Sequence, residues 1–392
     1  MSETASASKP CKRCKAPDAP LRLRNDPTCR PCYVAFVESK AGRRLGALAR
    51  DTRTSARPAP RRYLGGLSFG SSSTLMTQVL DNSARFHSSQ RSSPAFEAHL
   101  VHIDTRLSRH PNQHDSPAQR LLDAYRKRFT RVSFECVHLC KALTLDTIDW
   151  SLFPSIAATG HVQNEMERLE CIMDSLPSAT SRADVTRLLT RHILLHMALQ
   201  GSYAALILGH STTALASMAL SEVANGRGYS IPWQISDGIR IVSTSPKASD
   251  GTEATDKVAN WAQIAIYYPL REVMRHEIMQ YLELVPSLRE LMPTDSAETS
   301  NSIVSHKDLS IEQVMQRYFD SVEGSYSGIV ANVVRTAGKL DTFAHDSSLC
   351  ALCGMTLDEK GDSHWAGELG HSLEPKRTPT VLCYGCKRSI NG

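Results

Sequence analysis

Apolar residues between positions 63 and 292 alternate between short continuous runs and runs with helical spacing. The short runs predict five strands, at 63–67, 99–103, 132–137, 204–208 and 263–267. The helical spacing predicts helices at 74–83, 163–175, 182–199, 212–224 and 270–285. This alternation is typical of strand–helix–strand units, so we expect an α/β fold with a doubly wound parallel sheet.

The segments on either side of this region have a different composition. A helix is predicted at 33–50, and a stretch rich in Arg and Pro follows it. Residues 293–310 are rich in Ser, Thr and Asp, and a helical region follows at 311–340. We expect five parts: a cysteine-rich module with a helix (1–50), a basic linker (51–62), the α/β domain (63–292), a linker with a helical region (293–340) and a second cysteine-rich module (341–392).

Eight of the eleven cysteines form two CxxC pairs near each end of the chain: Cys11, Cys14, Cys29 and Cys32, then Cys350, Cys353, Cys383 and Cys386. Two such turns present four thiolates to one tetrahedral ion, which predicts two structural zinc sites in zinc-ribbon-like modules. His364 and His371 are possible substitute ligands in the second. Disulfides are the alternative, disfavoured because residues 1–10 lack the apolar segment of a secretion signal. We expect a cytoplasmic protein without a membrane span.

The net charge of +5 conceals an asymmetry along the chain. Residues 1–131 contain 24 Lys and Arg against 10 Asp and Glu, whereas the remainder is acidic. The linker 51–62, a basic neck, and a basic cluster at 126–128 predict contacts with a polyanion such as folded RNA. The candidates are Arg43, Arg44, Arg53, Arg57, Arg61, Arg62, Arg126, Lys127 and Arg128. A solvated basic neck is the alternative interpretation.

A loop of small residues, 68–73, lies between the first predicted strand and its helix. Its backbone N–H groups can hold a phosphate at a helix N-terminus. The alternative is a Ser-rich turn with Ser72 or Ser73 as the N-cap. His192 and His196 lie four residues apart on one helix face, but without the glutamate of an HExxH motif we expect core or surface histidines rather than ligands.

The order of these motifs resembles a known family. The loop, then Gly209-His210 at a helix start, Gly226-Arg227-Gly228 after that helix, Pro269-Leu270-Arg271 before Glu277-Ile278, and the two cysteine sets resemble the PP-loop tRNA thiolases. Within them, the chain is most similar to the cytoplasmic tRNA 2-thiolation protein 2 family. The resemblance implies a PP-loop sheet of the adenine nucleotide alpha hydrolase-like type. It also implies a degenerate ATP site at Ser68, Gly70, Ser72, Ser73 and His210.

Departures from the family motif S-G-G-x-D-S indicate weakened ATP chemistry. Phe69 replaces the first glycine and Ser72 the aspartate, and serine is a poor magnesium ligand. Residues 211–214 replace an acidic pair. Active relatives carry a cysteine pair at positions corresponding to 183–186 and a further catalytic cysteine downstream, but no cysteine occurs between Cys171 and Cys350. The remaining three, Cys136, Cys140 and Cys171, are expected to be buried apolar residues.

The resemblance therefore implies a non-catalytic subunit, in a heterodimer with a catalytic PP-loop paralogue that binds ATP. That paralogue would take sulfur from a thiocarboxylated ubiquitin-like modifier. The product would be 2-thiolated wobble uridine in tRNA, as 5-methoxycarbonylmethyl-2-thiouridine of lysine, glutamine and glutamate tRNAs. Two alternatives remain: an autonomous ATP-dependent tRNA thiolase, and an interaction protein in conjugation of the modifier.

Overall fold

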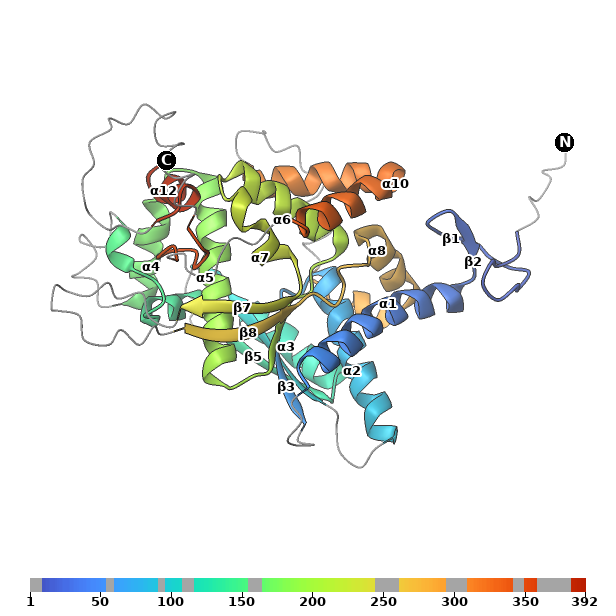
Figure 1. The fold of residues 1–392 in the computed structure, drawn as a ribbon. Helices are drawn as coiled ribbons and strands as arrows, with labels where there is room; N and C mark the ends of the chain where they lie inside the picture. The colour runs from blue at the N-terminus through green and yellow to red at the C-terminus, as the bar shows by residue number, and fades with distance from the viewer. Residues whose placement is uncertain are drawn as a thin grey trace.

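A six-stranded sheet forms the centre of the molecule (Figure 1). The computed structural model describes residues 9–53, 60–90, 96–107, 116–153, 164–243, 261–293, 309–340, 349–357 and 382–392. The strand order is β5-β4-β3-β6-β8-β7. The strands are β3 (Arg61–Gly66), β4 (Phe96–Asp104), β5 (Val132–His138), β6 (Ala205–Ile207), β7 (Gly238–Ser243) and β8 (Trp261–Tyr267). All five predicted strands are present and run parallel.

The sixth strand, β7, was not predicted and runs antiparallel to β8 at the sheet edge. Arg240 fixes this edge, because its guanidinium donates to the carbonyls of Pro232, Trp233 and Ser236. An antiparallel edge strand on an otherwise parallel sheet is common in doubly wound folds. The predicted parallel sheet is therefore correct for the interior strands and incomplete at this edge.

Helices cover both faces of the sheet and bury two separate apolar cores. One face packs against α1 (Arg30–Asp51), α2 (Ser71–Gln90), α3 (Pro117–Arg128), α8 (Arg275–Leu284) and α9 (Pro286–Arg289). The other packs against α4 (Glu165–Asp174), α5 (Ala179–Gln200), α6 (Thr212–Ala224), α7 (Ile231–Ile235) and α10 (Ile311–Ala337). The 3-10 turns of the described residues, η2 (Leu139–Thr144), η3 (Trp150–Leu152) and η4 (Gly228–Ser230), lie in the connections. Alternation along a strand feeds both cores, because Ala205 and Ile207 face one and Leu206 the other.

The two ends of the chain lie at opposite sides of the sheet. A hairpin of β1 (Leu21–Leu23) and β2 (Asp26–Thr28) precedes α1 and projects from the body, whereas α12 (Tyr384–Asn391) lies beside α5 (Figure 1). None of the helices in the described residues has the length and apolarity of a membrane span.

The strand order creates a crevice at the carboxyl ends of β3 and β6. From β3 the chain continues to one side, through β4 and β5, and from β6 to the other, through β8. Such a reversal leaves adjacent loops diverging above the sheet, and ligands of doubly wound proteins bind there. The small-residue loop 68–73 follows β3 and His210 follows β6, so both predicted landmarks meet at this point.

Candidate functional site

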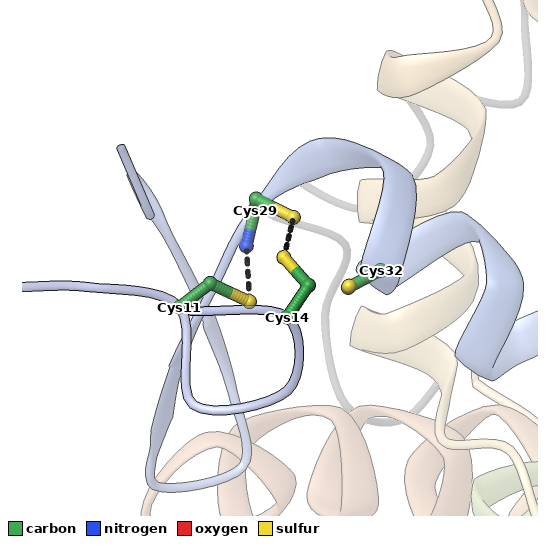
Figure 2. A group of neighbouring side chains, drawn as sticks. All are labelled: Cys11, Cys14, Cys29 and Cys32. Carbon is green, nitrogen blue, oxygen red and sulfur yellow. Dashed lines mark hydrogen bonds between the residues drawn. The ribbon is translucent and has the colours of Figure 1, made fainter. Parts of the chain in front are cut away.

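The N-terminal cysteine quartet meets at the start of α1 (Figure 2). Cys11 and Cys14 lie on a turn, and Cys29 occupies the N-cap position of α1, one helical turn before Cys32. The four sulfurs lie within 4.8 Å of one another, and those of Cys14 and Cys29 are 3.5 Å apart. The predicted set therefore comes together in space.

The spacing and chemistry of this quartet fit a tetrahedral metal ion. Four Zn–S bonds of about 2.3 Å would place sulfurs roughly 3.8 Å apart. Backbone donors, first that of Cys14, lower the pKa of the Cys11 thiol to about 6. Neighbouring thiols, first that of Cys29, raise the pKa of Cys32 to about 12. Thiolates at this separation repel one another, so all four ionise together only beside a cation, and zinc would fix the turn to the helix.

The C-terminal quartet has the same donor set but lies inside the main core. Its members are at most 2% exposed: Cys350, Cys353, Cys383 and Cys386. Their sulfurs lie within 4.8 Å of one another, with 3.8 Å between those of Cys353 and Cys383. The backbone N–H of Cys383 donates to Cys350 Sγ at 3.3 Å. Four thiolates complete a tetrahedral set, and the predicted substitutes His364 and His371 lie outside the described residues.

A buried arginine connects this quartet to the α/β core. Arg227 is fully buried, and its Nη1 lies 3.8 Å from Cys386 Sγ. It donates to Glu222, with Nε 2.8 Å from Oε2, and to Asp184, which also accepts a 2.6 Å hydrogen bond from Ser389 of α12. Burial opposes ionisation of Asp184, but Arg227 and then Arg187 lower its pKa overall. This network holds α12 against α5 and α6.

The glycines beside Arg227 make this close packing possible. Gly226 has φ +79°, and a Cβ there would lie 2.3 Å from the Tyr384 ring. A Cβ at Gly385 would lie 2.5 Å from the carbonyl oxygen of Asn225. The Gly226-Arg227-Gly228 motif is therefore the docking point of the C-terminal helix, a role the sequence did not reveal.

His192 also fastens the C-terminal segment. Its Nε2 donates to the Leu352 carbonyl at 2.7 Å, and its Nδ1 lies 3.1 Å from Thr147 Oγ1. Burial lowers the pKa of His192 to about 4, so the ring is neutral at physiological pH. This confirms the expectation of a satisfied core histidine rather than a metal ligand.

A cavity of about 500 Å³ opens at the crevice between β3 and β6. All predicted nucleotide-site residues line it: Ser68, Gly70, Ser72, Ser73 and His210. None of the described lining residues is Asp, Glu or Cys, and Arg275 is the only Lys or Arg among them. The cavity is large enough for a small ligand, but the part of its lining that the structure describes offers no carboxylate for magnesium and no thiolate for sulfur transfer.

Phe69 shows how the loop differs from a glycine-rich one. Its backbone is left-handed, with φ +59°, at the position where the family motif has glycine. A non-glycine residue there costs about 1–2 kcal/mol. The ring is 3% exposed and packs against His102, with 4.3 Å between ring centroids, and against Tyr125. Burial of the ring offsets the strain, so the loop keeps the conformation without glycine.

The hydroxyl groups of the loop bond mainly to the loop itself. Ser68 Oγ lies 3.2 Å from Ser73 Oγ and accepts from the Gly70 N–H at 3.4 Å. Ser73 Oγ and Thr74 Oγ1 both donate to the Gly70 carbonyl, at 3.0 and 2.9 Å. The loop is thus a self-bonded turn at the start of α2, and Ser72 is the half-buried hydroxyl that lines the cavity at the aspartate position.

The stretch that follows β6, Gly209-His210, also has a structural role. A Cβ at Gly209 would lie 3.2 Å from Ser73 Cα, so the loop after β6 approaches α2 closely. Burial lowers the pKa of His210 to about 4, and its buried Nδ1 has no hydrogen-bond partner among the described residues. Ser211 caps α6 by accepting from Ala214 N at 3.1 Å.

Thr213, within the stretch that replaces the acidic pair, fastens α10 to the body. Its hydroxyl donates to Glu323 of α10 at 2.9 Å and accepts from the Arg275 N–H at 3.0 Å. Glu323 also accepts from His276 Nδ1 at 2.7 Å. A neutral hydroxyl serves as a structural link where the active motif has a carboxylate.

The remaining cysteines lie away from the cavity lining. Cys136 at the end of β5 and Cys140 in η2 are partly buried, and burial raises the pKa of both thiols. Cys171 on α4 is exposed, which corrects the expectation that all three are buried. It falls on the outer side of α4, whose inward side is formed by Leu169 and Ile172.

Several predicted RNA-contacting cations already have partners within the chain. Arg44 pairs with Asp237 and Glu272. Arg61 donates to the Ala49 carbonyl, Arg62 stacks on Tyr203, Arg126 pairs with Asp123, and Arg128 donates to Gln78. Arg43, Arg53 and Lys127 are exposed without such a pair among the described residues, and Arg57 lies outside them. The residues on β3 and α3 lie at the amino edge of the sheet, opposite the cavity.

Comparisons with known proteins agree with this architecture. A sequence model of the family described as cytoplasmic tRNA 2-thiolation protein 2 matches residues 310–378. A relative of that name from Pyrenophora tritici-repentis is 32% identical over 98% of this chain and 95% of its own length. One from Sclerotinia sclerotiorum is 33% identical over 87% and 85%.

A solved structure supports the same fold. The U34-tRNA thiolase NcsA from Methanococcus maripaludis, with its [4Fe-4S] cluster, matches with a TM-score of 0.52 and 14% identity, over 88% of this chain and 95% of that one. The fold is therefore of the PP-loop type. Together with the near-complete sequence matches, this shows that the chain belongs to the cytoplasmic tRNA 2-thiolation protein 2 family.

Proposed function

We propose that the chain is a non-catalytic subunit of the cytoplasmic complex that places sulfur on C2 of the tRNA wobble uridine. The observation that carries this proposal is the crevice cavity, which lies where doubly wound proteins bind ligands but has no carboxylate or thiolate in its described lining. The relatives of this chain are named for tRNA 2-thiolation and for the cytoplasm, which supports both the proposed reaction and the proposed location.

The chemistry missing here must come from a partner chain. A catalytic PP-loop paralogue in a heterodimer would bind ATP, adenylate the uridine and receive sulfur from a thiocarboxylated ubiquitin-like modifier. The substrates would be lysine, glutamine and glutamate tRNAs that carry a 5-methoxycarbonylmethyl group. This chain would stabilise the paralogue and contact the tRNA.

Complementation of cells that lack this chain tests the proposal. The wild-type chain and Ser72→Ala should restore equal 2-thiouridine, measured by mass spectrometry of digested tRNA, because Ser72 supports no reaction step. Cys383→Ser should not restore it, since it disrupts the core. A loss of 2-thiouridine with a well-folded Ser72→Ala chain would contradict the proposal and favour catalysis at this cavity.

The proposal also requires a paralogue to be present. Deletion of this chain should lower both 2-thiouridine and the amount of the paralogue recovered as a soluble complex. Normal 2-thiouridine in the deletion strain would overturn the proposal and leave a role in modifier conjugation.

A further inference from the structure

The N-terminal cysteine module carries a dense set of exposed cations. Between residues 9 and 32 only two carboxylates, Asp18 and Asp26, occur beside seven basic residues. All seven are exposed: Lys9, Lys12, Arg13, Lys15, Arg22, Arg24 and Arg30. The module thus bears a strong positive field on a small unit.

Three of these cations are engaged in holding the module in place. Lys12 Nζ lies 2.7 Å from Asp26, and Arg24 Nε lies 3.3 Å from Glu277 of α8. The Arg13 guanidinium lies 4.7 Å above the Phe36 ring of α1. These contacts fix the orientation of the hairpin against α1 and α8.

The other four have no salt-bridge or hydrogen-bond partner among the described residues: Lys9, Lys15, Arg22 and Arg30. The basic residues on β3 and α3 are different, because most of their guanidinium groups already bond to other groups of the protein. An unneutralised cation gains more from an incoming phosphate, because no internal partner is displaced.

Two turns of the module present cations on strained backbone. Lys15, one residue after Cys14, has φ +63°, and Arg24, at the β1–β2 turn, has φ +57°. Left-handed positions in tight turns favour Gly or Asn. Basic residues there cost stability, and such costs concentrate at functional positions.

The module lies toward the carboxyl edge of the sheet, where the cavity opens. Arg24 contacts Glu277 in the first turn of α8, and Arg275, the first residue of α8, lines the cavity. Figure 1 shows the hairpin extending outward beyond the N-terminal end of α1. A polyanion that lies over the cavity edge of the sheet can therefore reach the arm.

We propose that this module is an RNA-contacting arm, in which Lys9, Lys15, Arg22 and Arg30 bind backbone phosphates of tRNA. The inference rests on the proposed function, which makes tRNA the polyanion that the complex meets. It assigns the main phosphate contacts of this chain to the arm rather than to the guanidinium groups on β3 and α3. The metal would keep the four cations in a fixed arrangement by holding the turn and helix together.

The test uses the full chain co-expressed with its catalytic paralogue and an unmodified lysine tRNA transcript. Affinity is measured between 50 and 200 mM salt for the wild type and for a variant with Lys9→Gln, Lys15→Gln, Arg22→Gln and Arg30→Gln. We expect at least tenfold weaker binding and a log–log salt slope smaller by about 2.8–3.6, since each of the four phosphate contacts contributes about 0.7–0.9 to the slope.

A matched control neutralises four exposed cations elsewhere, with Lys141→Gln, Arg289→Gln, Arg335→Gln and Lys339→Gln. This variant should bind like the wild type. Zinc content reports whether the arm stays folded. A double variant, Lys9→Gln with Arg22→Gln, avoids the residues next to cysteines. The double variant should lower the logarithm of the tRNA affinity by about half as much as the quadruple variant does.

The outcomes separate this inference from the proposed function. Unchanged affinity and slope in the zinc-replete quadruple variant overturn the arm while the wild-type complex still binds tRNA. Loss of the paralogue with intact tRNA affinity also overturns it and makes the arm a protein interface. A wild-type complex that neither binds nor thiolates tRNA contradicts the proposed function itself.

Discussion

The two cysteine quartets have the same four ligands but different surroundings. Among the described residues, the N-terminal quartet apart from Cys14 belongs to a small apolar cluster with Ala16 and Ala19 of its own module, and Cys14 is exposed. The C-terminal quartet belongs to the same core as β4, α5 and α6, and a buried arginine lies against it. One metal site would therefore support a projecting arm, whereas the other would support the whole α/β body.

The same ligand motif therefore fixes the chemistry of both sites, but it does not determine how much of the protein each metal ion stabilises. Structural zinc contributes free energy to whatever folds around it. The N-terminal metal would stabilise a hairpin and one end of α1. The C-terminal metal would stabilise the packing of α12 on α5 and of the 349–357 turn on His192.

The largest expected effect is that of Cys383→Ser. Loss of one thiolate should release the C-terminal metal and expose the core beneath it. We expect the free energy of unfolding to fall by more than about 5 kcal/mol, comparable to the total stability of many domains. Thermal unfolding and metal analysis measure this, with the exposed Cys171→Ser as the control that should match the wild type.

Arg227→Met tests the buried charges independently of the metal ligands. It leaves Asp184 and Glu222 in the core without their main counter-charge, which typically costs about 3–5 kcal/mol. Denaturant unfolding gives the value. Arg388→Met is the control, because Arg388 is exposed and loses only a surface hydrogen bond to the Ala224 carbonyl, which should cost less than about 1 kcal/mol. Equal effects of the two variants would mean that the network does not join α12 to the body.

Cys29→Ser should have a smaller effect on the body than Cys383→Ser. The chain should lose one of two zinc equivalents, and protease cleavage should appear within residues 9–32. The main unfolding transition should shift by less than about 1 kcal/mol, since the quartet lies outside both main cores. A shift as large as that of Cys383→Ser would remove the distinction between the two sites.

The smallest effect concerns the attachment of α10, which depends on pH. The hydrogen bond to Glu323 raises the pKa of His276 above 6.5, so this stabilisation is complete below 6.5 and lost as pH rises through the raised value. Burial opposes the charge of Glu323, but hydrogen bonds from His276 lower its pKa below 4.5. That contribution is present above 4.5 and lost as pH falls through the lowered value.

Both contributions coincide between about pH 4.5 and 6.5. Because the His276 side chain is 43% exposed, water screens the pair, and we expect less than about 1 kcal/mol. His276→Gln should remove the fall in stability between pH 6 and pH 8.5. An unchanged pH profile in that variant would assign the dependence to another group.

Sequence periodicity predicted the interior of the fold because buried parallel strands and their helices have strong apolar patterns. It did not predict α3, although Ser116 caps that helix and Pro117 follows at its first position. The run of basic residues at the end of α3 predicts a charged surface and carries no apolar helical pattern of its own. β7 was missed because a short edge strand depends on pairing with β8 rather than on its own pattern.

The candidate site was predictable where neighbours in sequence carry the chemistry, as in the CxxC pairs and the loop at 68–73. It was not predictable where distant residues meet. Arg44 was expected to face RNA, but it pairs with Asp237, which no local pattern indicates. Arg227 likewise meets Cys386 across 159 positions of the chain. Charge in sequence does not distinguish a paired guanidinium from a free one.

The most direct measurement is a thiolation assay with the purified, zinc-replete chain alone. ATP, magnesium, the thiocarboxylated modifier and a lysine tRNA that carries the 5-methoxycarbonylmethyl group but no 2-thio group are supplied, and 2-thiouridine is measured by mass spectrometry. We expect no 2-thiouridine from this chain by itself, and formation of 2-thiouridine once the catalytic paralogue is added. Formation of 2-thiouridine by the chain alone would contradict it.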